Sequence, residues 1–191
     1  INSGNGIVAT GRGVTGDADY VAPGFTIENN MYVGATTDQG SISGDLYVLG
    51  AGTGNPFTVV AGGDVSIGSI LQVLGGKELA FTSANQGGGN YNLFVGSGDV
   101  NEGIMVGDAS QSASLTVSGV GMLQVDGSVI TYGDFDVTDA GYVSVGQVNV
   151  NDGEFNVDAH SVYMGGLVSN SSDGVQVSAG MNIDVEGTVQ N

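Results

Sequence analysis

The sequence predicts an all-β protein, a single-stranded β-solenoid with about 20 residues and three short strands in each coil. Three observations predict this fold. A strand-like triplet recurs every twenty residues, two further triplets fit between its copies, and glycines separate the triplets. Each triplet has two apolar residues around a polar one, so a strand would place the apolar pair on one face. A fixed short period is typical of proteins in which successive sequence repeats of one chain stack on each other.

The second half of the chain carries the clearest copies. The first set comprises Leu115-Thr116-Val117, Phe135-Asp136-Val137, Phe155-Asn156-Val157 and Val175-Gln176-Val177. The second set comprises Leu123-Gln124-Val125, Val143-Ser144-Val145, Val162-Tyr163-Met164, which comes one residue early, and Ile183-Asp184-Val185. The third set comprises Val129-Ile130, Val148-Asn149-Val150, Leu167-Val168 and Thr188-Val189. We expect the members of one set to lie directly above each other, one in each coil.

Glycines punctuate these sets and are expected to mark the corners of each coil. They are Gly121, Gly127, Gly133, Gly141, Gly146, Gly153, Gly165, Gly166, Gly174, Gly180 and Gly187. A three-residue strand must then turn sharply, and a positive φ angle is cheap only for glycine. The sequence therefore predicts left-handed backbone at the corners.

Upstream the same triplets appear at irregular spacings. They are Phe25-Thr26-Ile27, Met31-Tyr32-Val33, Leu46-Tyr47-Val48, Phe57-Thr58-Val59, Val65-Ser66-Ile67, Leu71-Gln72-Val73, Leu79-Ala80-Phe81, Leu93-Phe94-Val95 and Ile104-Met105-Val106. The polar, Gly-rich inserts 50–56 and 83–92 read as loops bulging from corners. We expect residues 1–24 to form an N-terminal arm, cap or donor segment and residues 25–191 to form one solenoid domain.

Composition excludes several classes of protein. The chain has 36 glycines without a Gly-X-Y period, and its 40% apolar content is enough for a core. Only Lys77 and Arg12 balance twenty acidic residues, for a net charge of −18. Nucleic acid is excluded as a partner because neutralising phosphates requires basic side chains.

The sequence contains no cysteine, no apolar run long enough for a membrane span and no signal peptide. The chain begins at Ile1, and signals can be removed by processing.

Two stretches carry a resemblance to a known group of proteins. Residues 115–127 and 139–146 have the Gly-rich, Val/Leu-alternating style of coils in large bacterial surface proteins. They resemble autotransporter passenger domains and filamentous-haemagglutinin-like adhesins, well over residues 93–191 and loosely over 25–92. The resemblance implies secretion to the cell surface and a mechanical or adhesive role.

One predicted column is acidic. Stacking at twenty-residue spacing places Ser114, Asp134, Glu154 and Gly174 above each other, so two carboxylates meet about 4.8 Å apart. Their repulsion would be removed by a bound cation, and calcium is the candidate cofactor, with Asp136 or Asp152 as a further ligand. The alternative is that these side chains point into water and are screened. No other cofactor is expected.

Tyrosines at the centres of three triplets suggest a glycan site. Tyr32, Tyr47 and Tyr163 take the polar place in their triplets, so they should point outward, where aromatic rings can stack on sugars. The alternative for this outward surface is a polar ladder that keeps the face soluble, as in the column Thr116, Asp136, Asn156 and Gln176.

An enzyme is the rival hypothesis, because β-helices also host polysaccharide lyases and hydrolases. A lyase needs a cation or a basic residue, and this chain has one lysine and one arginine, far apart in sequence. A glycosidase needs two carboxylates, which Asp134, Asp136, Asp139 or Asp152 could supply. No tryptophan is present for sugar subsites. We therefore expect no catalytic residues.

The ends of the chain favour self-assembly. The alternation continues without a charged cap through Ile183, Val185 and Val189, and such an edge invites another strand. Ile7 and Val8 lie in an alternating segment that could supply it. The sequence thus predicts a structural subunit of an extracellular bacterial or archaeal surface fibre, built from identical copies stacked end to end. An adhesin shaft that binds glycans or a host surface, and a polysaccharide-degrading enzyme, are the alternatives.

Overall fold

The computed structural model describes residues 102–190 without a break. Upstream it describes residues 31–33, 40–42, 46–48, 57–61, 64–67, 70–73, 76, 78–83 and 91–96. Ile7, Val8, the expected arm 1–24 and the triplet 25–27 lie outside the described residues.

The described residues form strands and no helix, so the all-β prediction is confirmed. Upstream are β1 (Met31–Val33), β2 (Gly40–Ile42), β3 (Leu46–Val48), β4 (Phe57–Ala61), β5 (Val65–Ile67), β6 (Ile70–Val73), β7 (Glu78–Ser83), β8 (Asn92–Val95) and β9 (Gly103–Val106). The longer strands follow as β10 (Ser114–Ser118), β11 (Met122–Tyr132), β12 (Asp134–Asp152), β13 (Phe155–Ser169) and β14 (Val175–Val185), with the short β15 (Val189–Gln190) last. Every upstream triplet within the described residues lies in a strand, whereas β2 has no triplet and was not predicted.

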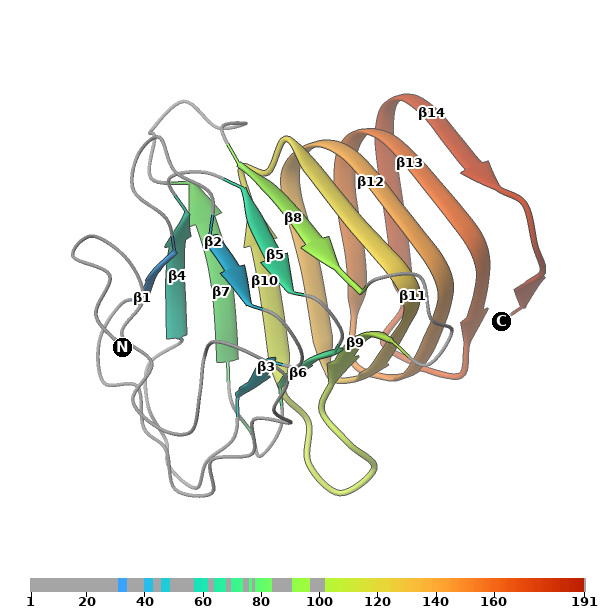
Figure 1. Cartoon of the computed structure of the whole chain (residues 1–191). Coiled ribbons are helices and arrows are strands. Elements are labelled where there is room, and N and C mark those ends of the chain that lie inside the picture. Colours follow the sequence, from blue (N-terminus) through green and yellow to red (C-terminus); the bar gives the residue numbers. More distant parts are fainter. Residues whose placement is uncertain are drawn as a thin grey trace.

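Parallel pairing arranges these strands in three ladders, which we call the first, second and third. The first ladder joins β1, β4, β7 and β10 to the opening segments of β12, β13 and β14. The second joins β2, β5 and β8 to segments of β11, β12, β13 and β14. The third joins β3, β6 and β9 to later segments of β11, β12 and β13 and ends at β15. Figure 1 shows the strands side by side, from β1 at one end to β14 at the other. This parallel arrangement is compatible with a β-helix.

Register within the ladders follows the predicted sets with one correction. Phe135 pairs with Phe155 and Phe155 with Val175, each twenty residues apart. In the third ladder, however, Leu167 pairs with Val189 and not with Thr188. The last copy of the third set therefore lies one residue later than the sequence suggests.

Strand length also differs from the prediction of short strands, because β11, β12, β13 and β14 continue through the corners. Backbone hydrogen bonds continue there, from β12 to the residues that join β10 to β11. Gly141 N donates to Val120 O at 2.9 Å, and Tyr142 N donates to Gly121 O at 2.9 Å. The corner is thus a bend within a paired strand.

The corner glycines are required mainly by close backbone approach, not by left-handed φ. Of the glycines in the predicted corner set, only Gly153 and Gly174 have positive φ. A Cβ on Gly146 would lie 2.2 Å from Gly127 O, and one on Gly187 would lie 2.1 Å from Gly165 O. No side chain fits at those distances, which explains why these positions are glycine. Because most of these glycines lack a positive φ, the expectation of left-handed corners was wrong for most positions.

A bulge explains why one triplet arrives a residue early. Val137 pairs with Val157, but the next pair is Ala140 with Ala159, so β12 carries one extra residue there. Asp139 lies in this bulge with φ of 54°, the only positive φ of a non-glycine residue among the described residues. The extra residue is absorbed by a left-handed turn of the backbone.

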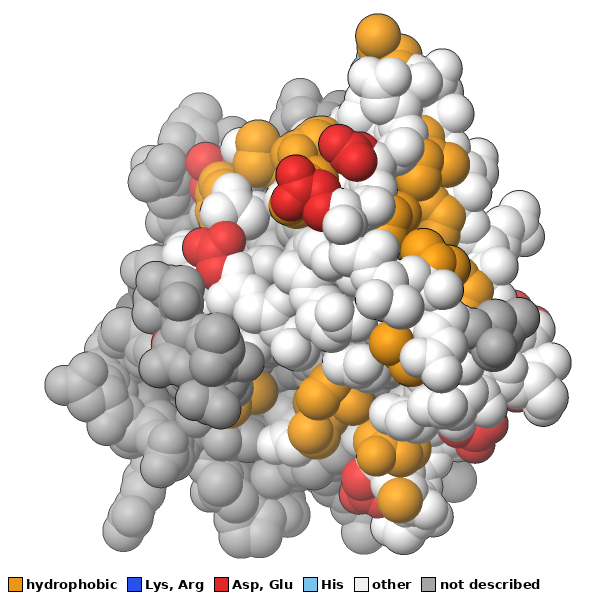
Figure 2. Space-filling view, turned by 90° about the vertical axis from the view of Figure 1, so that its right-hand side faces the viewer, with side chains coloured by type: hydrophobic (Ala, Val, Ile, Leu, Met, Phe, Trp, Pro, Cys, Tyr) orange, Lys and Arg blue, Asp and Glu red, His pale blue; other side chains and the backbone are white. Residues whose placement is uncertain are grey.

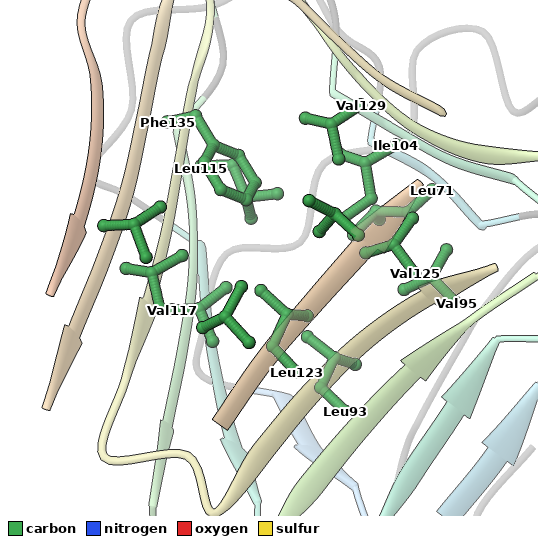
Figure 3. Packing of buried hydrophobic residues seen from close by; sticks show 14 of the residues in the cluster. Leu71, Leu93, Val95, Ile104, Leu115, Val117, Leu123, Val125, Val129 and Phe135 are labelled. Atoms are coloured by element: carbon green, nitrogen blue, oxygen red, sulfur yellow. The ribbon is translucent and has the colours of Figure 1, made fainter. Parts of the chain in front are cut away.

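The core lies between the three ladders. Figure 3 shows Leu115 and Phe135 of the first ladder, Leu93 and Leu123 of the second, and Leu71, Ile104 and Val129 of the third pointing into one interior. All of these side chains are buried. β5, β6, β8 and β10 thus bury alternate residues, as the apolar-polar-apolar pattern requires.

Candidate assembly edge, acidic column and tyrosine positions

The unpaired edge of β14 and β15, here called the β14 edge, lies at one end of the ladders. Among the described strands, both pair only with β13. The expected assembly residues lie here: Ile183 is 51% exposed and Val189 64%, while Val185 is half-buried against the core. Figure 2 views this end and shows hydrophobic side chains exposed around it, with acidic side chains beside them. An unsatisfied apolar edge of this kind favours pairing with another strand.

The β14 edge continues the core columns. Phe135 and Phe155 are fully buried and Val175 follows them half-buried. Val143 and Val162 are buried, and Ile183, the next member of their column, is half-exposed. The same apolar positions that are covered inside the stack are therefore open at its end.

In the acidic column, Asp134 and Glu154 are linked by a hydrogen bond, and Asp136 lies two residues after Asp134 in β12. Asp134 Oδ1 accepts a hydrogen bond from the backbone N–H of Glu154 at 3.0 Å. Asn156 Nδ2 donates to Asp136 Oδ1 at 2.9 Å and to Glu154 Oε2 at 3.1 Å. Asp152 pairs with Tyr132, two residues before Asp134, and the closely approaching Gly133 and Gly153 lie between that pair and the Asp134–Glu154 contact.

The Asn156 amide therefore bridges Asp136 and Glu154, two of the four carboxylates that the sequence assigns to calcium. The carboxamide of Asn156 supplies two donors, one to each of two acids, which satisfies part of their hydrogen-bonding capacity without a cation. Within the described part of the chain, no group of three or more His, Cys, Asp or Glu side chains is arranged to hold a metal ion. Calcium binding stays a prediction. The sequence did contain a signal for this amide bridge, because Asn156 follows Asp136 in the predicted column Thr116, Asp136, Asn156 and Gln176.

The three predicted tyrosines lie in three different ladders. Tyr32 is in β1 of the first ladder, Tyr47 in β3 of the third and Tyr163 in the second-ladder segment of β13. The structure does not bring them together. Tyr163 donates its hydroxyl hydrogen to Glu186 Oε2 at 2.9 Å, and this bond raises the pKa of Tyr163.

Sequence reasoning missed Tyr142, which lies beside Tyr163. It precedes the triplet Val143-Ser144-Val145, so the alternation of that strand, extended one residue upstream, places it outward with Ser144. Its side chain is 37% exposed. The triplet pattern did not include Tyr142, because this residue lies one position before its triplet.

Comparisons with protein-family models, curated proteins and solved structures find no match for this chain. In the residues that the structure describes, no helix has the length and apolar character needed to cross a membrane.

Proposed function

We propose that this chain is a β-solenoid subunit of an extracellular surface fibre, with a structural and non-enzymatic role, and that identical copies stack end to end. The β14 edge of one copy is the acceptor. The strands β1, β2 and β3 of the next copy are the donors, because they begin the same three ladders that end at β14 and β15.

The observation that carries the proposal is the change in exposure along each column. In the third ladder, Val129 and Val148 are fully buried, Leu167 is 9% exposed and Val189 is 64% exposed. Another coil laid on the β14 edge would cover these apolar side chains, and burial of apolar area is the main favourable term in association. The same coil would pair the free backbone groups of β14.

Direction and register support a head-to-tail contact. All three ladders are parallel, so a copy added in the same orientation continues each ladder without reversal. The two contacting surfaces are then different faces of the same molecule, and repetition of a heterologous contact that does not close gives a filament. Mechanical strength would come from hydrogen bonds continuing along the axis.

The charge supports separation of one filament from another. A net charge of −18 spread over the outward positions opposes side-by-side contact, while the apolar β14 edge favours contact at the end. Growth in length is thus preferred over bundling.

The test is assembly of the full chain, followed by sedimentation velocity and negative-stain electron microscopy over a range of concentrations. We expect filaments whose diameter equals that of one subunit. The double variant Ile183→Lys, Val189→Lys should stay monomeric, because two ammonium groups would be buried in the contact. Ser112→Lys is the matched control, since this exposed residue precedes β10, three ladder positions from β14, and its variant should assemble normally.

A monomer at all concentrations, or equal assembly by the edge variant and the control, would overturn the proposal. The variant Ile7→Lys, Val8→Lys tests the donor strands. If β1, β2 and β3 supply the contact, this variant still assembles. Its failure to assemble would assign the donor strand to the N-terminal segment and overturn the proposed register.

A further inference from the structure

The outward surface of the second ladder concentrates aromatic and polar side chains on neighbouring parallel strands. We call it the second-ladder outer face, and its members are Phe94, Met122, Gln124, Tyr142, Tyr163 and Asp184. Their sequence neighbours Val95, Leu123, Val143 and Val162 are buried, so alternation directs the members away from the core. Parallel strands about 4.8 Å apart make this face a shallow, repetitive surface.

Tyr142 and Tyr163 form the centre of this face. Tyr142 pairs with Ser161, and Ser144 pairs with Tyr163. The two tyrosines are therefore diagonal neighbours on adjacent strands, roughly 7–8 Å apart at the backbone. A serine lies opposite each ring, and so small a side chain leaves space beside the ring.

Hydrogen bonding holds one of the rings in place. The Tyr163 hydroxyl donates to Glu186 Oε2, which fixes the ring orientation before any ligand arrives. The bond to Glu186 is also the main reason why the pKa of Tyr163 is raised. A ring that is already ordered loses less conformational entropy on binding.

Polar groups surround the aromatic pair. Asn182, which pairs with Ser161, and Asp184, which pairs with Tyr163, are exposed on β14. On the other side, Gln124 Nε2 donates to Asp126 Oδ1 at 2.7 Å. Carboxylates accept hydrogen bonds from sugar hydroxyls, and side-chain amides both donate to them and accept from them.

We propose that the second-ladder outer face binds a neutral glycan chain, with sugar rings stacked on Tyr142 and Tyr163 and hydroxyls bonded to Asn182 and Asp184. Aromatic rings present an apolar face that matches the C–H face of a sugar. The acidic surroundings exclude uronic acids and sialic acids, because their carboxylates would be repelled. The site lies on the outer face of the ladder and reaches β14 through Asn182 and Asp184. Its rings belong to β12 and β13, so glycan binding does not require filament formation.

The experiment uses the full chain on an array of neutral oligosaccharides of glucose, mannose, galactose and N-acetylglucosamine, with uronic-acid oligosaccharides on the same array. Binding to at least one neutral oligosaccharide is expected, with none to the uronic acids. Calorimetry with that oligosaccharide should give a tenfold or larger loss of affinity for Tyr142→Ala and for Tyr163→Ala. Tyr132→Ala, a half-buried tyrosine at the end of β11, is the control and should bind like the unmodified chain.

Two further variants keep the rings and test the geometry. Ser161→Arg places a bulky side chain beside Tyr142 and should also weaken binding tenfold. Tyr163→Phe keeps the stacking ring but loses the bond to Glu186, so it should bind better than Tyr163→Ala and worse than the unmodified chain. Absence of neutral-glycan binding, a preference for uronic acids, or equal loss in Tyr132→Ala would overturn the proposal.

Discussion

The rings of Phe135 and Phe155 stack in parallel, with centroids 5.1 Å apart and planes inclined by 7°. The two residues are direct partners in the first ladder, one in β12 and one in β13. Their separation is close to the spacing of paired strands, so the ladder itself sets the stacking distance. Both side chains are fully buried. The core in this region is therefore a column, in which each layer supports the next.

Truncation within this column is expected to be costly. Phe155→Ala removes a buried ring and its stacking partner, and should lower the free energy of unfolding by about 3–5 kcal/mol. Urea denaturation followed by circular dichroism measures the effect. Phe155→Leu, which keeps most of the volume, should cost much less. Equal losses for the two variants would contradict the stacked-column arrangement.

A buried hydroxyl in the third ladder offers a stabilising substitution. Thr131 is fully buried between Val106 and Val150, and within the described residues its Oγ1 has no hydrogen-bond partner. Thr131→Val replaces this hydroxyl with a methyl group of similar size. The free energy of unfolding should rise by about 1–2 kcal/mol. Thr131→Ser keeps the hydroxyl and loses the methyl group, so it should be destabilising; a fall in stability for Thr131→Val would show that the hydroxyl is satisfied.

The bulge in β12 depends on a residue that tolerates left-handed backbone. Asp139 adopts φ of 54°, which costs β-branched residues more than Asp or Asn. Asp139→Val should lower the free energy of unfolding by about 1–2 kcal/mol, whereas Asp139→Asn should leave it nearly unchanged. Thr138→Val, at the exposed neighbouring position, is the control. Thermal denaturation of the three variants distinguishes backbone strain from a general effect of apolar substitution on this turn.

Corner glycines should differ in their tolerance of a methyl group. A Cβ on Gly146 would lie 2.2 Å from Gly127 O, whereas one on Gly180 would lie no closer than 3.4 Å, from His160 Nδ1. Neither glycine has positive φ. We therefore expect Gly146→Ala to destabilise by about 1–3 kcal/mol or to separate the strands locally, while Gly180→Ala changes stability little. Chemical denaturation compares the two, and equal effects would assign glycine a role other than close approach.

Stability should fall at high pH because of one buried tyrosine. Tyr91 is 1% exposed and donates to Ser118 O at 3.2 Å, and burial raises the pKa of Tyr91 well above its ordinary value of 10.0. The folded state then keeps a proton that the unfolded chain loses above pH 10. The stabilisation is complete below that pH and declines above it, by up to about 1.4 kcal/mol per pH unit.

The measurement is urea denaturation at pH 8, 10 and 11 for the unmodified chain and for Tyr91→Phe. The phenylalanine variant loses a hydrogen bond, so it should be slightly less stable at pH 8, but its stability should fall less between pH 10 and 11. Parallel declines for the two proteins would mean that other groups control the alkaline transition.

Much of the strand pattern could be predicted because the signal is local. The triplet Leu71-Gln72-Val73 predicts a strand, and β6 contains it, with Leu71 and Val73 buried. The register of Phe135 on Phe155 also followed from spacing alone. By contrast, β2 has glycine at its first position and so lacks the apolar pair that marks the others.

The surface could be predicted only in part, because the positions of outward side chains depend on neighbours from other strands. Asp134 accepts a hydrogen bond from the backbone of Glu154, and the amide of Asn156 bridges Glu154 to Asp136. That amide can be placed only when the neighbouring strands are seen in three dimensions. Likewise Tyr142 lies in β12 and Tyr163 in β13, and the register that makes them diagonal neighbours follows the one-residue bulge at Asp139.

Within the described residues, the sequence by itself determined most strand positions, most of the ladder register and which side chains of a strand face inward, because alternation of apolar and polar residues is read along one strand. Only the tertiary structure decided why Gly146 must be glycine and which outward residues of different strands become neighbours. Those outcomes depend on distances between backbones one layer apart, and a linear pattern contains no such distance.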